Sequence, residues 1–295
     1  MRPILSVIIV TYYSEQEISD CLLSIPQTLQ ERNVEVIVVD NRSPDGTTSL
    51  ITKSFPSVRL IALDENIGFS KANNIGYENS IGEYVLFLNP DTISNSEAYA
   101  HCLRRIQEDQ SIGLISPKLI TASQQMDLAC RRSIPTIWCG FCRAVGLAAK
   151  FPTSRLFASY NLTYLPENGT YDVGAINGAF MLCSRSSLIR FGAFDEQYFM
   201  YGDDLDLCYR CAKAGYRVVY DGQVQMIHLK GMSSSKEASR MSKALFSATL
   251  QFYLKHFNPR NSLLVRLKYK LLVRAWELLA RAKRRTAGYQ GVRPL

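Results

Sequence analysis

Short runs of β-branched and aromatic residues, each followed by a helical pattern, recur along the first 120 residues of this chain. Nearly continuous apolar runs of this length are typical of strands covered on both faces. The predicted strands span residues 4–10, 34–39, 58–63, 84–88 and 112–116. Strands that alternate with helices indicate an α/β fold with a mostly parallel central sheet flanked by helices. The pair Ser14 and Glu17 predicts a capping box at the start of the first helix.

Polar residues gather where these runs end. Asp40 follows the second predicted strand, Asn66 the third and Asp91 the fourth. Ligands of such sheets bind beyond the carboxyl ends of the strands, so we expect a site at this edge. From about residue 121 to 171 the pattern becomes irregular, and we expect this segment to lie over the site.

Positive charge is confined to the end of the chain. The 295 residues carry a formal net charge of +8, yet the segment from Arg260 onward holds ten Lys and Arg against one acid, Glu277. The rest is therefore close to neutral. This argues against a nucleic-acid partner for the body of the protein and for a local electrostatic contact of the tail.

The apolar start of the chain, residues 4–10, is short and runs into Tyr12 and Tyr13 without a small-residue cleavage site. We therefore predict no secretory signal and a cytoplasmic protein. Its eight cysteines are then expected to be thiols. The pairs Cys139/Cys142 and Cys208/Cys211 mimic zinc spacing, but they lie too far apart for a zinc ribbon.

Two acidic motifs could carry chemistry. Asp91, directly after a strand, is placed to hold a divalent cation on a diphosphate, although Asn-Pro-Asp is also good turn chemistry. Asp203, Asp204 and Asp206 open a helical run, where acids favour the helix dipole. Three acids in four residues exceed what capping needs, which favours a general base that accepts a proton from a hydroxyl.

The remaining candidates are weaker when taken alone. A lone histidine such as His228 is more often structural than a ligand. Gly68 would let the backbone approach a phosphate at a helix start, although an ordinary solvated turn explains it too. Arg131 and Arg132 could contact a phosphate or an acceptor bidentately, or they form a solvated pair on a loop.

Taken in order, these motifs resemble the inverting family 2 glycosyltransferases of the GT-A fold, and within them the rhamnosyltransferase branch. The resemblance extends from about Leu5 to Ser235. It rests on the motifs Val10-Thr-Tyr12, Val38-Val-Asp-Asn41, Asn66-Ile-Gly-Phe69 with Asn73-Asn74, Leu88-Asn-Pro-Asp-Thr92, Gly178-Ala-Phe-Met181, Phe194-Asp-Glu196, Tyr201-Gly-Asp-Asp-Leu-Asp206 and His228.

The resemblance implies roles for these residues. A nucleotide-diphospho-sugar donor would be bound by Thr11, Tyr12, Asp40, Asn41, Asn66, Gly68, Phe69, Lys71, Asn73, Asn89, Asp91 and Gly178. Asp91 and His228 would hold Mg²⁺ or Mn²⁺, with Asn89 standing where the generic motif has Asp. Asp204 would be the catalytic base, and Asp203, Arg131 and Arg132 would face the acceptor. The first expectation for the donor is dTDP-rhamnose, and for the acceptor a polyprenyl-diphosphate-linked saccharide in cell-surface polysaccharide synthesis.

The tail has a helical period of its own. Leu264, Leu267, Leu271, Ala275, Leu278 and Ala282 fall on one face, and Arg266, Lys270, Arg274, Arg281 and Arg284 on the other. This pattern favours an interfacial helix on the cytoplasmic face of the inner membrane, although a helix packed on the body fits as well. We therefore divide the chain into a catalytic domain, residues 1–235, and a basic helical region, residues 236–295.

Other functions fit the motifs less well. A nucleotidyltransferase that makes nucleotide-sugars would share the layered sheet, but a Gly-rich basic loop is expected after its first strand, where this chain has Thr11-Tyr-Tyr-Ser-Glu15. A Rossmann dehydrogenase needs G-x-G-x-x-G, which this chain lacks. A non-catalytic sugar-nucleotide-binding protein would not need Asp91, Asp204 and His228 together. The sequence does not determine the oligomeric state.

Overall fold

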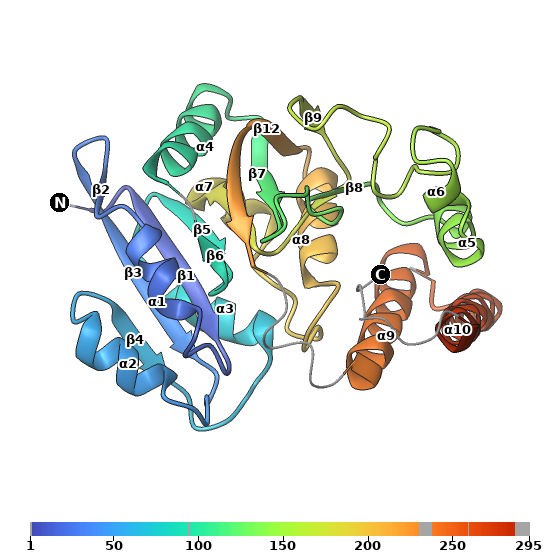
Figure 1. Ribbon diagram of the computed structural model, residues 1–295, viewed down its shortest axis with the longest axis horizontal. Helices are drawn as coiled ribbons and strands as arrows, with labels where there is room; N and C mark the ends of the chain where they lie inside the picture. The colour runs from blue at the N-terminus through green and yellow to red at the C-terminus, as the bar shows by residue number, and fades with distance from the viewer. Residues whose placement is uncertain (1, 94, 230–237, 259, 287–295) are drawn as a thin grey trace.

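The computed structural model describes residues 2–93, 95–229, 238–258 and 260–286. In these residues a ten-stranded mixed sheet runs in the order β2-β3-β1-β5-β11-β7-β12-β6, with β4 beside β3 and β9 beside β12. Helices lie on both sides of this sheet (Figure 1). The strands of the sheet are β1 (Leu5–Thr11), β2 (Thr28–Leu29), β3 (Arg32–Asp40), β4 (Arg59–Ala62), β5 (Tyr84–Leu88), β6 (Thr92–Ile93), β7 (Ile112–Ile120), β9 (Thr170–Asp172), β11 (Phe180–Ser184) and β12 (Arg217–His228).

Apart from the two-residue β2, which is antiparallel to β3, the N-terminal half of the sheet is parallel, as expected from the alternating pattern. β1 pairs with β3 on one side and β5 on the other, and every residue of β1 is buried. The helices of this half are α1 (Ile18–Ser24), α2 (Thr47–Ser54), α3 (Phe69–Glu78) and α4 (Ser96–Glu108). The capping box predicted at Ser14 and Glu17 is wrong: Glu17 makes no side-chain cap bond, and the amide of Ile18 donates to the carbonyl of Ser14 instead.

The centre of the sheet departs from the parallel arrangement. β11 lies antiparallel to both β5 and β7, with Phe180 opposite Leu88 at the carboxyl end of β5. The cause lies in the preceding segment. β7 runs parallel to β5, and after β9 the chain returns to the carboxyl end of β5, where the amide of Asn89 donates to the carbonyl of Ala179 (3.0 Å). β11 starts there and must therefore run in the opposite direction.

The irregular segment contains more structure than its sequence suggests. It forms β8 (Arg131–Arg132), which pairs with β10 (Ala175–Ile176), and two helices, α5 (Ile137–Val145) and α6 (Leu147–Lys150). Arg131 anchors it. Its guanidinium is fully buried, donates to the carbonyls of Leu165 (2.6 Å) and Pro166 (2.7 Å), and lies 5.0 Å from the ring centroid of Tyr220.

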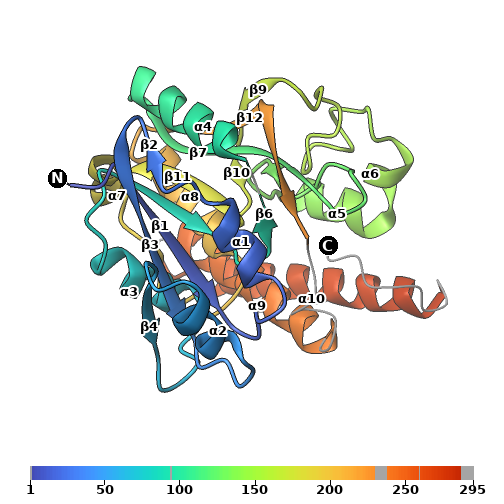
Figure 2. The same cartoon turned by 60° about the vertical axis from the view of Figure 1, so that its left-hand side comes forward.

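Four more helices complete the described residues: α7 (Arg185–Phe191), α8 (Asp203–Lys213), α9 (Ala238–Phe257) and the long α10 (Leu263–Thr286). α9 and α10 pack on each other, and α10 runs beside α5 in both views (Figures 1 and 2). Trp276 of α10 lies against Gly140 of α5, where any side chain would collide with its ring. The helical region is therefore joined to the irregular segment by close packing.

A buried carboxylate fixes α9 to α8. Asp206 accepts hydrogen bonds from Arg210 (2.7 Å) in its own helix and from Lys255 (2.6 Å) and His256 (2.7 Å) in α9. Burial alone would raise the pKa of Asp206, but the hydrogen bonds from His256, Lys255 and Arg210 outweigh it and lower the pKa to about 2. The charged form of Asp206 thus stabilises the contact between the two helices.

The prediction that α10 is a helix is confirmed. The structure shows that this helix has two apolar faces, of which only the leucine face was expected from the sequence. Tyr269, Val273 and Trp276 pack against α9. The leucines of the predicted stripe point away, and Leu263, Leu264, Leu267, Leu271 and Leu278 are between 53% and 83% exposed. Side chains beyond Leu278, including Arg281, Ala282 and Arg284, and the expected boundary after residue 235 lie outside the described residues. Within the described part, no helix is long and apolar enough to cross a membrane.

We predict that Asp206→Asn lowers the free energy of unfolding at pH 7 by about 3–5 kcal/mol, because Arg210, Lys255 and His256 lose the buried carboxylate that faces them. Since the folded pKa is depressed, the contribution of Asp206 is present above its unfolded pKa of about 4 and is lost as the pH falls toward 2. Urea denaturation from pH 7 to 2 should therefore show a shallower acid decline in the variant. Asp172→Asn, which breaks an exposed pair with Arg217, is the control and should cost less than about 1 kcal/mol. Equal losses in the two variants would contradict this role of Asp206.

Candidate active site

Asp91 and His228 meet at the edge of the sheet. Asp91 lies in the turn between β5 and β6, and the antiparallel pairing of β6 with β12 places His228 opposite Thr92. The Nε2 atom of His228 is 3.3 Å from Oδ1 of Asp91, and the amide of Leu229 donates to the Asp91 carbonyl at 2.9 Å. Two candidates 137 positions apart in the sequence are thus brought together by strand pairing.

A second carboxylate lies on the other side of His228. Oδ2 of Asp127 is 3.5 Å from Nδ1 of His228, and Asp127 is fully buried. Burial alone would lower the pKa of His228, but the hydrogen bonds and charges of Asp127 and Asp91 outweigh it and raise the pKa to about 9. Asp127 was not identified from the sequence, because it lies in the irregular segment and belongs to none of the recognised motifs.

Asp204 lies at the start of α8 with both carboxylate oxygens engaged. Its Oδ2 accepts from Arg132 (2.6 Å) and from the amide of Gly178 (3.2 Å), and its Oδ1 accepts from the amide of Leu205 (2.7 Å). Burial alone would lower the pKa of Arg132, but the charge and hydrogen bond of Asp204 outweigh it and raise that pKa. The Arg132 guanidinium therefore stays charged, and its hydrogen bond holds the Asp204 side chain in one orientation.

The neighbouring Asp203 has a different environment. Its side chain is buried, and burial, followed by the adjacent charge of Asp204, raises the pKa of Asp203. The two consecutive side chains therefore differ: Asp204 is paired with Arg132, whereas Asp203 is buried and more readily holds a proton.

The pair of Asp91 and His228 is linked to Asp204 by one network of ion pairs and hydrogen bonds. The side chain of Asn177 donates to Asp127 (3.1 Å), which faces His228, and the next amide, that of Gly178, donates to Asp204. Asn177 and Gly178 directly precede β11, so the antiparallel strand that the sequence did not predict joins the two halves of the site. Asn177 was also missed by sequence reasoning.

Thr11 and Asp40 end the parallel strands β1 and β3, where they are paired in register. The hydroxyl of Thr11 donates to Oδ1 of Asp40 (2.8 Å), and the amide of Ser43 donates to Oδ2 (2.8 Å). Tyr12, the next residue, is exposed. The structure therefore presents Tyr12 at the surface and holds Asp40 almost completely buried beneath it.

The loop before α3 is held in place by asparagine side chains that belong to the motifs recognised in the sequence. Asn41 accepts from the amide of Ile67 (2.9 Å), and Asn66 accepts from the amide of Gly68 (3.1 Å). Lys71 is exposed, whereas Asn73 is buried and donates to the carbonyl of Phe69 (3.0 Å). Asn41, Asn66 and Asn73 therefore shape this loop, and Lys71 remains free to reach outward.

Two expectations need correction here. The first amide of α3, that of Phe69, donates to the carbonyl of Phe199 (2.8 Å) and so has no free hydrogen for a phosphate. Gly68 allows this approach: its φ is +90°, and a Cβ there would stand 2.7 Å from the same carbonyl. Arg131 is the second correction, because its fully buried guanidinium cannot contact an acceptor.

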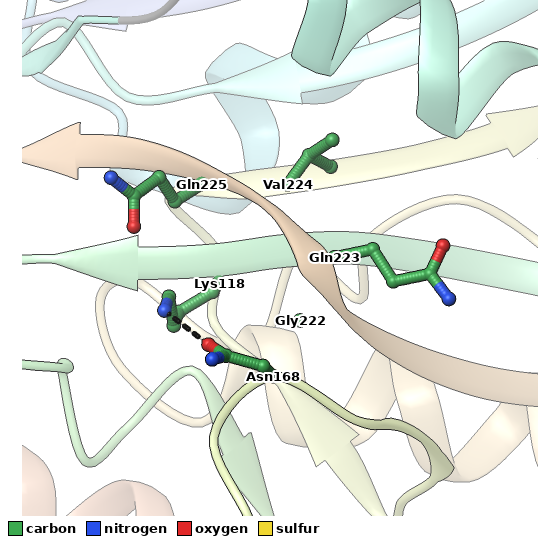
Figure 3. Close-up of a pocket in the computed structure, with 6 residues that line it drawn as sticks. All are labelled: Lys118, Asn168, Gly222, Gln223, Val224 and Gln225. Atoms are coloured by element: carbon green, nitrogen blue, oxygen red, sulfur yellow. Dashed lines mark hydrogen bonds between the residues drawn. The ribbon is translucent and has the colours of Figure 1, made fainter.

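A separate hollow lies along the irregular stretch of β12. It is lined by Lys118, Asn168 and residues 222–225, with the Lys118 ammonium donating to Asn168 at 2.7 Å (Figure 3). No carboxylate lines it. It is therefore not part of the network around Asp91, Asp204 and His228.

Comparison with known proteins identifies a family match in the N-terminal part of the chain. Residues 6–121, from β1 to the end of β7, match the family described as glycosyl transferase family 2. This part of the chain is therefore a glycosyl transferase family 2 domain. The matched segment includes Thr11, Asp40 and Asp91, whereas the segment with Asp204 and His228 lies beyond it.

Curated relatives extend the similarity over most of this glycosyltransferase. It is 29% identical to the N-acetylglucosaminyl-diphospho-decaprenol L-rhamnosyltransferase of Mycobacterium tuberculosis over 263 residues, which cover 85% of this chain and 84% of that protein. It is 26% identical to the rhamnosyltransferase WbbL of Escherichia coli, covering 64% and 67% of the two chains.

Solved structures support the GT-A fold. The mannosyltransferase PcManGT of Pyrobaculum calidifontis, solved with GDP-Man and Mn²⁺, matches 98% of this chain and 77% of its own with a TM-score of 0.58 and 18% identity. GalNAc-T7, solved with UDP, GalNAc and Mn²⁺, matches 98% of this chain and 58% of its own with a TM-score of 0.56 and 13% identity.

The residues of the network offer few ligands to a metal. The part of the chain described here contains no cluster of three or more His, Cys, Asp or Glu side chains that could hold an ion. Asp91 and His228 form a pair with one carboxylate and one imidazole. Such a pair fits a divalent cation whose remaining ligands are substrate phosphates and water, which is the usual mode for Mg²⁺. Binding would require His228 to lose its proton.

We predict that Gly68→Ala destabilises the site more than Gly215→Ala does. Both glycines have a positive φ, +90° and +88°, but only at Gly68 would the new Cβ collide with backbone. The two variants share the conformational penalty, so the collision with Phe199 should cost Gly68→Ala a further ~1–3 kcal/mol. Urea denaturation measures the difference, and isothermal titration with a nucleoside diphosphate tests the loop. Equal stability and unchanged nucleotide affinity would contradict this interpretation.

Proposed function

We propose that this family 2 glycosyltransferase is inverting and metal-dependent, and moves a sugar from a nucleotide-diphospho-sugar to a hydroxyl of a lipid-linked saccharide. The observation that carries the proposal is the network from Asp91 through His228, Asp127, Asn177 and Gly178 to Asp204. It brings a candidate cation site and a candidate base into one polar edge of the sheet.

The nucleotide would lie at the carboxyl ends of β1 and β3. In this proposal Thr11, Tyr12, Asp40 and Asn41 contact the base and ribose, with Tyr12 exposed for stacking. The sugar diphosphate would extend past the loop of Asn66, Gly68, Phe69, Lys71 and Asn73 toward Asn89, Asp91 and Gly178. Lys71, the exposed cation of this set, is suited to a phosphate.

The chemistry needs a leaving group that can depart and a hydroxyl that can attack. Mg²⁺ or Mn²⁺ held by Asp91 and His228 would neutralise charge on the departing diphosphate. Asp204 would accept the proton of the acceptor hydroxyl as the hydroxyl oxygen forms its bond to the anomeric carbon. Arg132 and the amide of Gly178 hold the Asp204 carboxylate in place for this transfer. A single in-line displacement inverts the anomeric configuration.

The donor and acceptor are inferred from relatives. The names of the Mycobacterium tuberculosis and Escherichia coli relatives favour rhamnose as the transferred sugar, and the first also favours a polyprenyl-diphosphate-linked N-acetylglucosaminyl acceptor. For the donor we propose dTDP-rhamnose. Thermal shift with Mn²⁺ and dTDP-rhamnose, UDP-GlcNAc or GDP-mannose is the direct test. Stabilisation by dTDP-rhamnose above the other two is expected, and a larger shift with another donor would reject this choice.

The C-terminal region would place the enzyme on the membrane. In this proposal residues 1–235 carry catalysis, and residues 236–295 bind the cytoplasmic face of the inner membrane through α10. The exposed leucines of α10 lie on a helix with eight Lys and Arg and one acid between Leu263 and Thr286. Apolar burial together with attraction to anionic lipid is the usual basis of such peripheral binding.

We predict that Asp204→Asn lowers the transfer rate by about 10²–10⁴-fold, because the near-isosteric amide cannot accept the proton. Affinity for the nucleoside diphosphate should stay unchanged, since the base contacts the acceptor. Asp203→Asn is the matched control and should keep transfer within about tenfold. Steady-state release of nucleoside diphosphate with an acceptor present measures both. If Asp203→Asn abolished transfer while Asp204→Asn did not, the roles of the two residues would be exchanged.

We predict that the double variant Leu267→Ser/Leu271→Ser weakens binding to phosphatidylglycerol-containing vesicles by at least about tenfold at low salt, because two exposed apolar side chains leave the lipid contact. Leu23→Ser on α1, an equally exposed leucine, is the control and should bind as the wild type does. Vesicle co-sedimentation measures the change. Absence of wild-type binding at low salt would reject the membrane proposal.

A further inference from the structure

The helix that follows Arg132 exposes an apolar face to solvent. In α5, Ile137, Trp138, Phe141 and Val145 are each between 40% and 44% exposed, while Cys139 and Cys142 face the interior. Large apolar side chains that share one exposed helical face mark an interaction surface more often than a free one. The network around Asp91, His228 and Asp204 does not include these four residues.

Aromatic side chains extend this face toward α6. The rings of Trp138 and Phe141 are 5.7 Å apart, those of Trp138 and Phe157 are 6.3 Å apart, and those of Phe151 and Phe157 are 5.4 Å apart. The indole nitrogen of Trp138 donates to the Leu156 carbonyl at 2.9 Å. The tryptophan is therefore oriented by one hydrogen bond while its ring stays partly exposed.

The charge around these aromatics has one sign. Between Asp127 and Glu167 the chain contains no Asp or Glu, but five arginine and lysine residues. Two of them, Arg131 and Arg132, are buried or paired inside the fold. The other three belong to the aromatic surface: Arg143 lies over the Tyr160 ring, Lys150 over the Phe151 ring and Arg155 over the Tyr164 ring.

This surface is continuous with two parts of the protein already described. Gly140, on the same helix, is the residue against which Trp276 of α10 packs. At the other end, Arg132 lies five residues before α5 and holds Asp204. α5 thus packs against the proposed membrane helix α10 (Figures 1 and 2), and the segment just before α5 contacts the proposed base through Arg132.

We propose that α5 and α6 form a second membrane-contacting surface, on which Trp138, Phe141, Val145 and Phe151 enter the interface of an anionic lipid bilayer. This surface delivers the lipid-linked acceptor to Asp204. The inference rests on the proposed function, which it extends from α10 to the acceptor side of the site. Aromatic side chains prefer the interfacial layer, and the surrounding Lys and Arg favour anionic headgroups over an apolar protein partner.

Fluorescence of Trp138 tests the contact directly, because the chain has two tryptophans and Trp276→Phe leaves Trp138 alone. We expect a blue shift and strong quenching when vesicles of brominated phosphatidylcholine and phosphatidylglycerol are added to the full-length variant. Unchanged Trp138 fluorescence in protein that co-sediments with these vesicles would overturn the α5 surface and leave binding through α10 intact.

Acceptor length provides the functional test. In Phe141→Ser/Val145→Ser we expect transfer to decaprenyl-linked N-acetylglucosaminyl diphosphate in vesicles to fall about tenfold, from the loss of apolar contact. Transfer to the farnesyl-linked analogue in solution should stay within twofold of the wild type. Leu23→Ser/Ile189→Ser, which changes two exposed apolar residues on α1 and α7, is the control and should alter neither.

The remaining outcomes also decide the question. Equal losses with both acceptors, or a wild-type dimer that the α5 double variant dissociates in light scattering, would overturn the lipid surface. If the wild type transferred to neither acceptor, the proposed function would fail. The Trp138 measurement would still decide whether α5 enters a bilayer, so the two failures are distinguishable.

Discussion

The ion pair between Arg132 and Asp204 is the interaction on which the arrangement of the site depends. It joins the irregular segment to the first turn of α8. The amide of Gly178, just before β11, donates a hydrogen bond to the same carboxylate. The pair is largely shielded from solvent, so removing one partner without a substitute hydrogen-bonding group would leave the other charge poorly compensated. The segment that sequence patterns described least is therefore the one that orients the proposed base.

The apolar strand patterns predicted the parallel half of the sheet, because a strand covered on both faces must be apolar at almost every position. They did not predict that β11 is antiparallel, because its direction depends on the path of residues 121–179. The same division applies to the site. Asp91, Asp204 and His228 belong to recognisable motifs, whereas Asp127 and Asn177 act through contacts that only the folded chain creates.

Arg131 and α10 show two further limits of sequence reasoning. A pair of adjacent arginines on a strand must point to opposite sides, and nothing in the sequence says that Arg131 is the one that faces inward beneath Tyr220. In α10 the leucine stripe was recognised, but Tyr269, Val273 and Trp276 form a second apolar face. A helix with two apolar faces can be assigned to its partners only after the neighbouring helix is placed.

The close packing of Trp276 against Gly140 has a geometric consequence for substrate choice. With no side chain at residue 140, α5 and α10 cannot tilt independently, and Asp206 fixes α9 to the helix that carries Asp204. In the proposed membrane-bound state the base would therefore sit at a set height above the headgroups. The enzyme would then select saccharides by the distance between their reactive hydroxyl and the bilayer. It would need no contact with the groups that distinguish one sugar from another.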